Sequence, residues 1–144
     1  MNVGLSVANT GEYIKMLHMD SETDNVIAFE FEYSLKEFKR RTHADVIEIG
    51  TVSIEGMPFK TVYSRSVNNG IHITASDGDG KTVYRGSLLI LGFDIIRGRE
   101  MLRDLTNEEI MQILKNLALM TIRDDGGNEP YNSYVLCNVS VSGN

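Results

Sequence analysis

The sequence predicts an α+β domain, in which a mainly antiparallel sheet of about six to eight strands packs against one long C-terminal helix, with one short helix near residues 35–43. Two observations lead to this prediction. Short segments rich in β-branched and aromatic residues recur along the chain, separated by turn-forming pairs such as Glu55-Gly56. Nearer the C-terminus, four apolar residues have the i, i+3, i+4, i+7 spacing of one helical face: Ile110, Ile113, Leu114 and Leu117.

Length and composition are those of one globular domain. The chain has 144 residues, of which 42% are hydrophobic and 24% charged, with only two prolines. A chain of this size buries roughly 68–70% of its unfolded surface in a single core. Because it contains no internal repeat, low-complexity tract or linker, residues 1–144 are expected to form one domain.

An alternating pattern predicts the first clear strand. Apolar residues recur at every second position from Ile27 to Tyr33, with glutamates at two alternate positions, which is typical of a strand with one face in water. The segment 12–19 is either its hairpin partner, across a turn at 20–25, or a short helix, because its apolar residues fit both periods. Weak alternation in residues 1–8 indicates an edge strand.

The middle of the chain is predicted to form hairpins on either side of a central strand. Residues 87–96 form a nearly unbroken apolar run, which predicts a strand buried on both faces. Reversals are expected at Glu55-Gly56, at Asn68-Asn69-Gly70 and at Asp77-Gly78-Asp79-Gly80. The remaining strands are expected at residues 46–54, 59–67, 71–76, 81–86 and 134–141.

Two motifs mark helix starts. Ser34 is followed three residues later by Glu37, and Thr106 by Glu109. At this spacing the side chains and backbone N–H groups of a first helical turn satisfy each other. The first motif predicts a short helix ending near His43, and the second predicts the long C-terminal helix.

The end of that second helix is expected to be unusually apolar. The segment 117–122 has no polar stripe, and Gly126-Gly127 is expected to end the helix. Such an end needs to be covered by the sheet or by another subunit, so we expect a homo-oligomer.

The charge balance and the cysteine content indicate which partners and which cellular location to expect. The formal net charge of −6 disfavours nucleic acid and anionic lipid as partners and favours a basic one. Two basic groups, 36–41 and Arg97 to Arg103, are expected to be solvated faces. The longest apolar stretches are too short to span a bilayer. With no secretory leader pattern and a single cysteine, Cys137, a cytoplasmic location is expected.

Candidate catalytic and metal-binding motifs are weak. His72-Ile73-Thr74 has the His-x-Thr form of two-histidine phosphoesterases, but neither His18 nor His43 supplies a second copy. The acidic loop 77–80 supplies too few oxygens for calcium and is better explained as a turn. Cys137 is better explained as a small core residue. Dinucleotide and Walker fingerprints are missing from the sequence, so we predict no catalytic residue, metal or cofactor.

Arginines are the strongest candidates for ligand binding. Guanidinium groups suit phosphate or carboxylate recognition because their donors form a rigid fork. Several could meet in one cleft, since some lie in predicted strands and others directly follow the buried strand. The predicted ligand-binding set is Arg65, Arg85, Arg97, Arg99 and Arg103. The alternative explanation for the same residues is exposed ion pairs with the abundant acidic side chains.

Three functional hypotheses follow, in order of preference. The first is a non-enzymatic protein that captures or inhibits a partner protein, as a toxin antidote or a phage-type accessory inhibitor does. The second is a protein that sequesters a nucleotide-like anion at a subunit interface. The third is a phosphoesterase-type hydrolase using His72.

Overall fold

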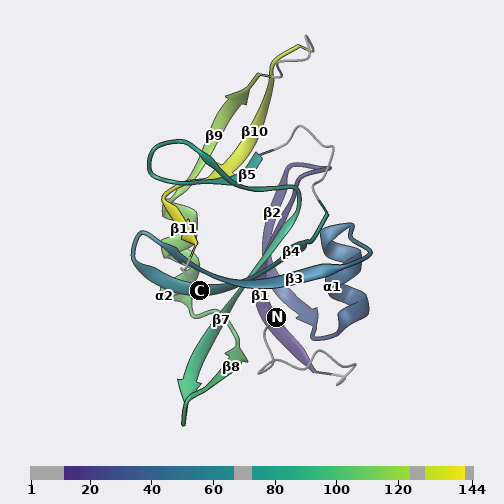
Figure 1. The fold of residues 1–144 in the computed structure, drawn as a ribbon, viewed down its shortest axis with the longest axis vertical. Coiled ribbons are helices and arrows are strands. Elements are labelled where there is room, and N and C mark those ends of the chain that lie inside the picture. The colour runs from purple at the N-terminus through teal and green to yellow at the C-terminus, as the bar shows by residue number, and fades with distance from the viewer. Residues whose placement is uncertain (1–11, 67–72, 124–128, 142–144) are drawn as a thin grey trace.

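A computed structural model describes residues 12–66, 73–123 and 129–141. In this part of the chain, eleven strands and two short helices form an α+β fold with two sheets (Figure 1). The elements are β1 (Tyr13–Asp20), β2 (Asn25–Glu32), α1 (Leu35–Thr42), β3 (Ile47–Ile54), β4 (Met57–Ser64), β5 (Ile73–Ser76), β6 (Thr82–Arg85), β7 (Leu88–Ile96), β8 (Arg99–Arg103), α2 (Asn107–Lys115), β9 (Leu117–Ile122), β10 (Tyr131–Leu136) and β11 (Val139–Val141).

The main sheet has the strand order β11-β3-β4-β7-β1-β2, and β8 pairs with the far end of β7. All of these pairs are antiparallel. The second sheet has the order β6-β5-β10-β9, and its β10–β5 pair is parallel. The prediction of a mainly antiparallel α+β fold is therefore confirmed, with more strands than expected.

Each face of the main sheet carries a buried apolar cluster. On one face, Phe38 of α1 joins a buried cluster with Leu89. On the other, Ile113 of α2 and Leu136 of β10 join a second cluster with Ile90. Because neighbouring residues of a strand point to opposite faces, β7 contributes to both clusters. Each large side chain buried in this way stabilises the fold by about 1.5–3 kcal/mol.

Several local predictions are confirmed. Segment 12–19 is the hairpin partner of β2, not a helix, and eight consecutive residue pairs join the two strands. Ser34 caps α1 by accepting a hydrogen bond from the Glu37 N–H, and the helix ends at His43, whose φ of 53° is left-handed. Thr106 and Glu109 form the full capping box of α2. The predicted hairpins around Glu55-Gly56 and 77–80 are also present.

The prediction of one long C-terminal helix is wrong. Both helices are short and lie mid-chain, and α2 ends at Lys115 with Asn116 as its C-cap. The segment expected to continue the helix is strand β9, which pairs with β10 over six residues. An apolar run without a polar stripe fits a strand as well as a helix, and here the pairing partner beyond residue 130 decides the outcome.

The expected last strand, 134–141, is two strands in different sheets. Asn138 separates them, with a left-handed φ of 60°. Its side-chain amide donates to Asn116 Oδ1 at 2.8 Å, and its carbonyl oxygen accepts from Glu55 N–H at 3.1 Å. The break therefore ties the C-terminus to the end of α2 and to the β3–β4 turn. The expected edge strand at 1–8, the reversal at Asn68-Asn69-Gly70 and the ending at Gly126-Gly127 lie outside the described residues.

Among the helices that the structure describes, neither is long and apolar enough to cross a membrane.

Buried His18 makes stability depend on pH. Its Nε2–H donates to the Arg41 carbonyl oxygen at 2.8 Å, near the end of α1. Burial lowers the pKa of His18 below its ordinary value of 6.5, against the opposing effect of that hydrogen bond. The unfolded chain therefore takes up a proton at a higher pH than the folded chain does. This contribution to stability is complete above pH 6.5 and is lost as the pH falls towards the folded pKa.

We expect the difference in unfolding free energy between the native protein and His18→Gln to shrink as the pH is lowered from about 7 to about 5. Glutamine can still donate to the Arg41 carbonyl but does not titrate. Urea unfolding of both proteins at several pH values measures this difference. A difference that stays constant across the window would show that His18 does not titrate differently in the two states.

Candidate functional site

Strand β7 extends beyond the sheet that it crosses. Its residues Leu88 to Ile90 pair with β1 on one side, and Leu88 to Leu91 pair with β4 on the other. Beyond Leu91, the strand pairs only with β8, from the Gly92–Arg103 pair to the Ile96–Arg99 pair. Residues 92–103, here called the arm, form a hairpin that projects from the body of the fold (Figure 1). The expectation that all of 87–96 is buried on both faces holds for its first half and is wrong for Ile95 and Ile96, which are exposed.

The tip of the arm is a tight two-residue turn. Ile96 pairs with Arg99, and the two residues between them, Arg97 and Gly98, have φ angles of 52° and 78°. Positive φ at both central positions is the type I′ geometry, whose twist matches that of a hairpin. The turn therefore holds the flanking side chains in a defined arrangement.

Large apolar side chains are exposed at this tip beside two cations. Ile95 is 66% exposed, Ile96 53% and Met101 51%. Arg97 and Arg99 flank them, and an open depression of about 480 Å³ is lined by Ile96, Arg97, Arg99 and Met101. The register places Ile96 and Met101 on one face of the hairpin with Arg99, and Ile95 on the other face. Exposed apolar side chains beside charged ones are typical of an interaction site. We call the group Ile95, Ile96, Arg97, Arg99 and Met101 the arm tip.

A buried ion pair holds one side of the arm to the sheet. Lys60 on β4 is only 2% exposed, and its Nζ lies 2.7 Å from Glu100 Oε1 on β8. Lys60 Nζ also donates to the Thr51 hydroxyl and lies 5.0 Å from the centroid of the Phe93 ring. The counter-ion, the hydroxyl and the aromatic face together compensate the buried ammonium. Two of these three partners of the Lys60 ammonium, Glu100 and Phe93, therefore come from the arm.

A second ionic cluster holds the base of the arm to α2. Arg103 donates from both Nη atoms to Glu109, at 2.7 and 3.0 Å, and its Nε lies 3.1 Å from Asp94 Oδ1. The same Glu109 carboxylate accepts from Thr106 N–H at 2.9 Å. Burial alone would raise the pKa of Glu109, but the hydrogen bonds from Arg103 and Thr106 outweigh it and lower the pKa. One carboxylate therefore both starts α2 and fixes the arm.

The five predicted arginines lie in three places. Arg97 and Arg99 are at the arm tip, and Arg103 is occupied at the base of the arm. Arg65 and Arg85 together line a separate recess between the ends of β4 and β6. The fold therefore separates the arginines into two pairs and one single residue, Arg103, and does not bring them into a single cleft.

The recess at Arg65 and Arg85 has an aromatic wall. Its volume is about 230 Å³. The rings of Tyr63 and Tyr84 lie 4.4 Å apart between centroids. Burial, followed by the proximity of Tyr84, raises the pKa of Tyr63 to about 12. Arg65 is bound to Glu48 at 2.8 Å, whereas Arg85 is exposed. The recess thus combines an aromatic surface with one guanidinium paired to an acid and one facing solvent.

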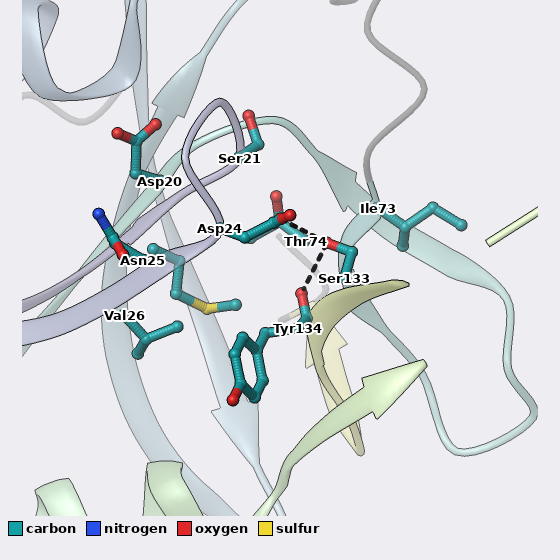
Figure 2. A pocket seen from close by; sticks show the side chains of 10 residues that line it. Asp20, Ser21, Asp24, Asn25, Val26, Ile73, Thr74, Ser133 and Tyr134 are labelled. Carbon is teal, nitrogen blue, oxygen red and sulfur yellow. Dashed lines mark hydrogen bonds between the residues drawn. The ribbon is translucent and has the colours of Figure 1, made fainter. Parts of the chain in front are cut away.

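The recess between the β1–β2 turn and the second sheet is a structural contact. Its volume of about 10 Å³ is the size of one water probe. Figure 2 shows Ser133 beside Asp24, and the Ser133 hydroxyl donates to Asp24 Oδ1 at 2.9 Å. This bond joins the turn to β10.

A serine, a histidine and an aspartate meet nearby. The Ser87 hydroxyl and His43 Nε2 both donate to Asp20 Oδ1, at 3.2 and 3.1 Å. The aspartate lies between the other two, whereas nucleophilic catalysis needs the base to contact the nucleophile directly. We therefore interpret this cluster as bracing the turn.

The remaining predicted candidates have structural partners or lie outside the described residues. Asp77 Oδ1 accepts from Asp79 N–H and Lys81 N–H, both at 2.9 Å, which confirms the acidic loop as a hairpin turn. Cys137 is half-buried, and its N–H donates to the Asn116 carbonyl oxygen at 2.8 Å. Among the described residues, histidine, cysteine, aspartate and glutamate side chains form no group of three that could hold a metal. His72 lies outside the described residues.

Sequence reasoning predicted Arg97 and Arg99 as binding residues but missed the exposed apolar residues beside them, although a signal for the hairpin tip was present. The pair Arg97-Gly98 follows an apolar run and precedes another segment of strand-forming length. A glycine at this point is compatible with a two-residue hairpin turn. Comparisons of the chain with protein-family models, with curated proteins and with solved structures found no match in any of the three.

Proposed function

We propose that this chain is a non-enzymatic recognition protein that captures a partner protein with the arm tip and inhibits it by occupying its surface. A toxin antidote or a phage-type accessory inhibitor acts in this manner. The observation that carries the proposal is the arm itself. It is a hairpin held to the body of the fold by two ionic clusters, and it presents exposed apolar side chains at its tip. A rigid projecting element binds well because little conformational entropy is lost on binding.

The chemistry of the tip defines the surface that fits it. Because Ile95 lies on one face of the hairpin and Ile96 and Met101 on the other, the partner needs an apolar depression that receives both faces of the tip. Arg97 and Arg99 require acidic groups at the rim of that depression. This local requirement is opposite to the basic partner that the net charge of −6 favours. Contact at the arm therefore takes an acidic patch, while the acidic body favours basic groups farther from it.

The proposal is tested by a pair of matched variants. Ile95→Asp and Leu119→Asp each place a carboxylate at an exposed apolar position, 66% exposed on the arm and 61% exposed on β9. Tagged proteins are used to recover partners from the native host, and calorimetry measures the affinity for the protein recovered by the native chain. We expect Ile95→Asp to weaken binding at least about tenfold, because a buried apolar anchor is replaced by a desolvated charge. Leu119→Asp should bind normally.

Equal binding by Ile95→Asp and the native chain would refute capture by the arm. Equal loss in both variants would point to the β9–β10 hairpin or to a general loss of stability. Circular dichroism of each variant separates those two outcomes.

A second candidate function is sequestration of a nucleotide-like anion, for which the recess at Arg65 and Arg85 is the supporting observation. Tyr63 and Tyr84 offer a surface for a base, and Arg85 offers a guanidinium for a phosphate. We rank it second because 230 Å³ is below the roughly 300–1,000 Å³ of typical ligand pockets. Native mass spectrometry of the purified protein distinguishes the two functions. A retained phosphate-bearing compound that is lost in Arg85→Ala would favour sequestration.

A further inference from the structure

Strand β2 is an edge strand of the main sheet. In the described part of the chain it pairs with β1 on one side only. It is eight residues long, and its pairing with β1 has no bulge. The opposite edge of the sheet, β11, is only three residues long, and the edge strand β6 of the second sheet has four residues and an irregular register. Long, regular edges are the ones that accept another strand.

The backbone hydrogen bonds show which groups of β2 face outward. Tyr33 N–H donates to the Glu12 carbonyl oxygen at 2.8 Å, just past the end of the β1–β2 ladder. Because hydrogen-bonded and non-hydrogen-bonded pairs alternate in an antiparallel ladder, the odd-numbered residues of β2 direct their backbone groups towards β1. The outward groups therefore belong to Val26, Ala28, Glu30 and Glu32.

The side chains of this edge are apolar on the face that carries α1. Phe29 is 62% exposed and Ile27 is 48% exposed, and both lie on the same face as buried Phe31. Helix α1 packs over β1, β3, β4 and β7, farther into the sheet. It therefore covers Phe31 and leaves the two residues nearer the β1–β2 turn uncovered.

We propose that a second copy of this chain pairs with β2, antiparallel, about a twofold axis at Phe29. In this register Phe29 opposes the partner subunit's Phe29 as a non-hydrogen-bonded pair, in which side chains approach most closely. Ala28 and the partner subunit's Glu30 exchange backbone hydrogen bonds, and so do Val26 and the partner subunit's Glu32. The two main sheets become one continuous sheet.

Charge selects this register among those that match the outward backbone groups. With the axis at Phe29, each glutamate of β2 faces an apolar residue across the junction. Moving the axis by one residue to Ala28 would place Glu32 opposite the partner subunit's Asp24. Like charges directly opposed across a ladder are destabilising. The β2 sequence is thus complementary to itself in the Phe29 register and not in its neighbour.

Single cysteines test the pairing and its register. In a Cys137→Ser background, Phe29→Cys would place two thiols across the axis, with Cα atoms about 4.5 Å apart, within the range of about 4.4–6.8 Å that a disulfide spans. We expect mild oxidation to cross-link Phe29→Cys into a covalent dimer, whereas Leu119→Cys on β9 forms no covalent dimer. Preferential cross-linking of Ala28→Cys would overturn the register, and cross-linking of none of the three would overturn the pairing.

Light scattering gives a second, independent readout. The native chain is expected to be dimeric at tens of micromolar. Phe29→Asp should be monomeric, because two carboxylates would meet at the axis, while Leu119→Asp should remain dimeric. Phe29 is exposed in the single chain, so the monomer should stay folded. A monomeric native chain, or dimeric Phe29→Asp, would overturn the proposal. Ile95→Asp should also remain dimeric, which separates this interface from capture by the arm.

Discussion

Replacing Glu100 by alanine is expected to lower the free energy of unfolding by about 3 kcal/mol, because it leaves a buried ammonium without its counter-ion. Lys60 is almost completely buried in the main sheet, and its Nζ lies 2.7 Å from the Glu100 carboxylate. The Thr51 hydroxyl and the Phe93 ring cannot replace a full negative charge. We place the loss at the lower end of the range for buried pairs because the Glu100 side chain is partly exposed. Urea unfolding measures the change.

A double-mutant cycle shows whether the buried charge is the cause. Lys60→Met removes the ammonium but keeps an unbranched side chain of similar length, so the pair Lys60→Met with Glu100→Ala should recover most of the stability lost by Glu100→Ala alone. If the losses of the two single variants add, the ion pair does not hold the arm. Proteolysis within 92–103 reports on the arm directly and should accelerate in Glu100→Ala.

Replacing Gly92 by alanine is expected to cost about 2 kcal/mol, because the new methyl group would occupy space that the Arg103 guanidinium fills. A Cβ at this position would lie 3.1 Å from Glu109 Oε1 and closer still to Arg103 Nη1. The Arg103 side chain would have to move, and its two hydrogen bonds to the Glu109 carboxylate would be lost. The absence of a side chain at Gly92 therefore provides the space in which the Arg103 guanidinium binds Glu109.

Gly78→Ala is the matched control for this prediction. A Cβ there would lie 3.7 Å from Asn138 Oδ1, an ordinary contact, and Gly78 does not have a left-handed φ. Its effect should stay within about 0.5 kcal/mol. Thermal unfolding of both variants provides the comparison. Similar losses at the two positions would mean that the effect comes from the glycine backbone and not from displacement of Arg103.

Local sequence signals predicted the elements whose causes are local. The serine at 34 and the threonine at 106, each followed by a glutamate three residues later, start both helices as expected. Period-two alternation located β2, and turn-forming residues located the hairpins at 55–56 and 77–80. These features succeed because caps and tight turns involve residues within a few positions of one another.

The failures share a different physical origin. Segment 117–122 is a strand because β10 pairs with it, and residues 134–141 form two strands because Asn138 turns between two sheets. The apolar run 87–96 is buried where it has a neighbouring strand on each side and exposed where it has only β8. In each case the local pattern was compatible with more than one structure, and a distant segment selected one of them.

The sequence by itself determined the fold class, the residues at which both helices begin, most strand positions and the net negative charge of the chain. Only the tertiary structure decided that β7 leaves the sheet as an arm, that Lys60 meets Glu100 across forty residues, and that the five arginines separate into three places. The physical reason is that propensity and capping depend on neighbours along the chain, whereas exposure and ion pairing depend on which strands lie side by side. The candidate sites of this protein depend on exposure and ion pairing, so they could be located only in the tertiary structure.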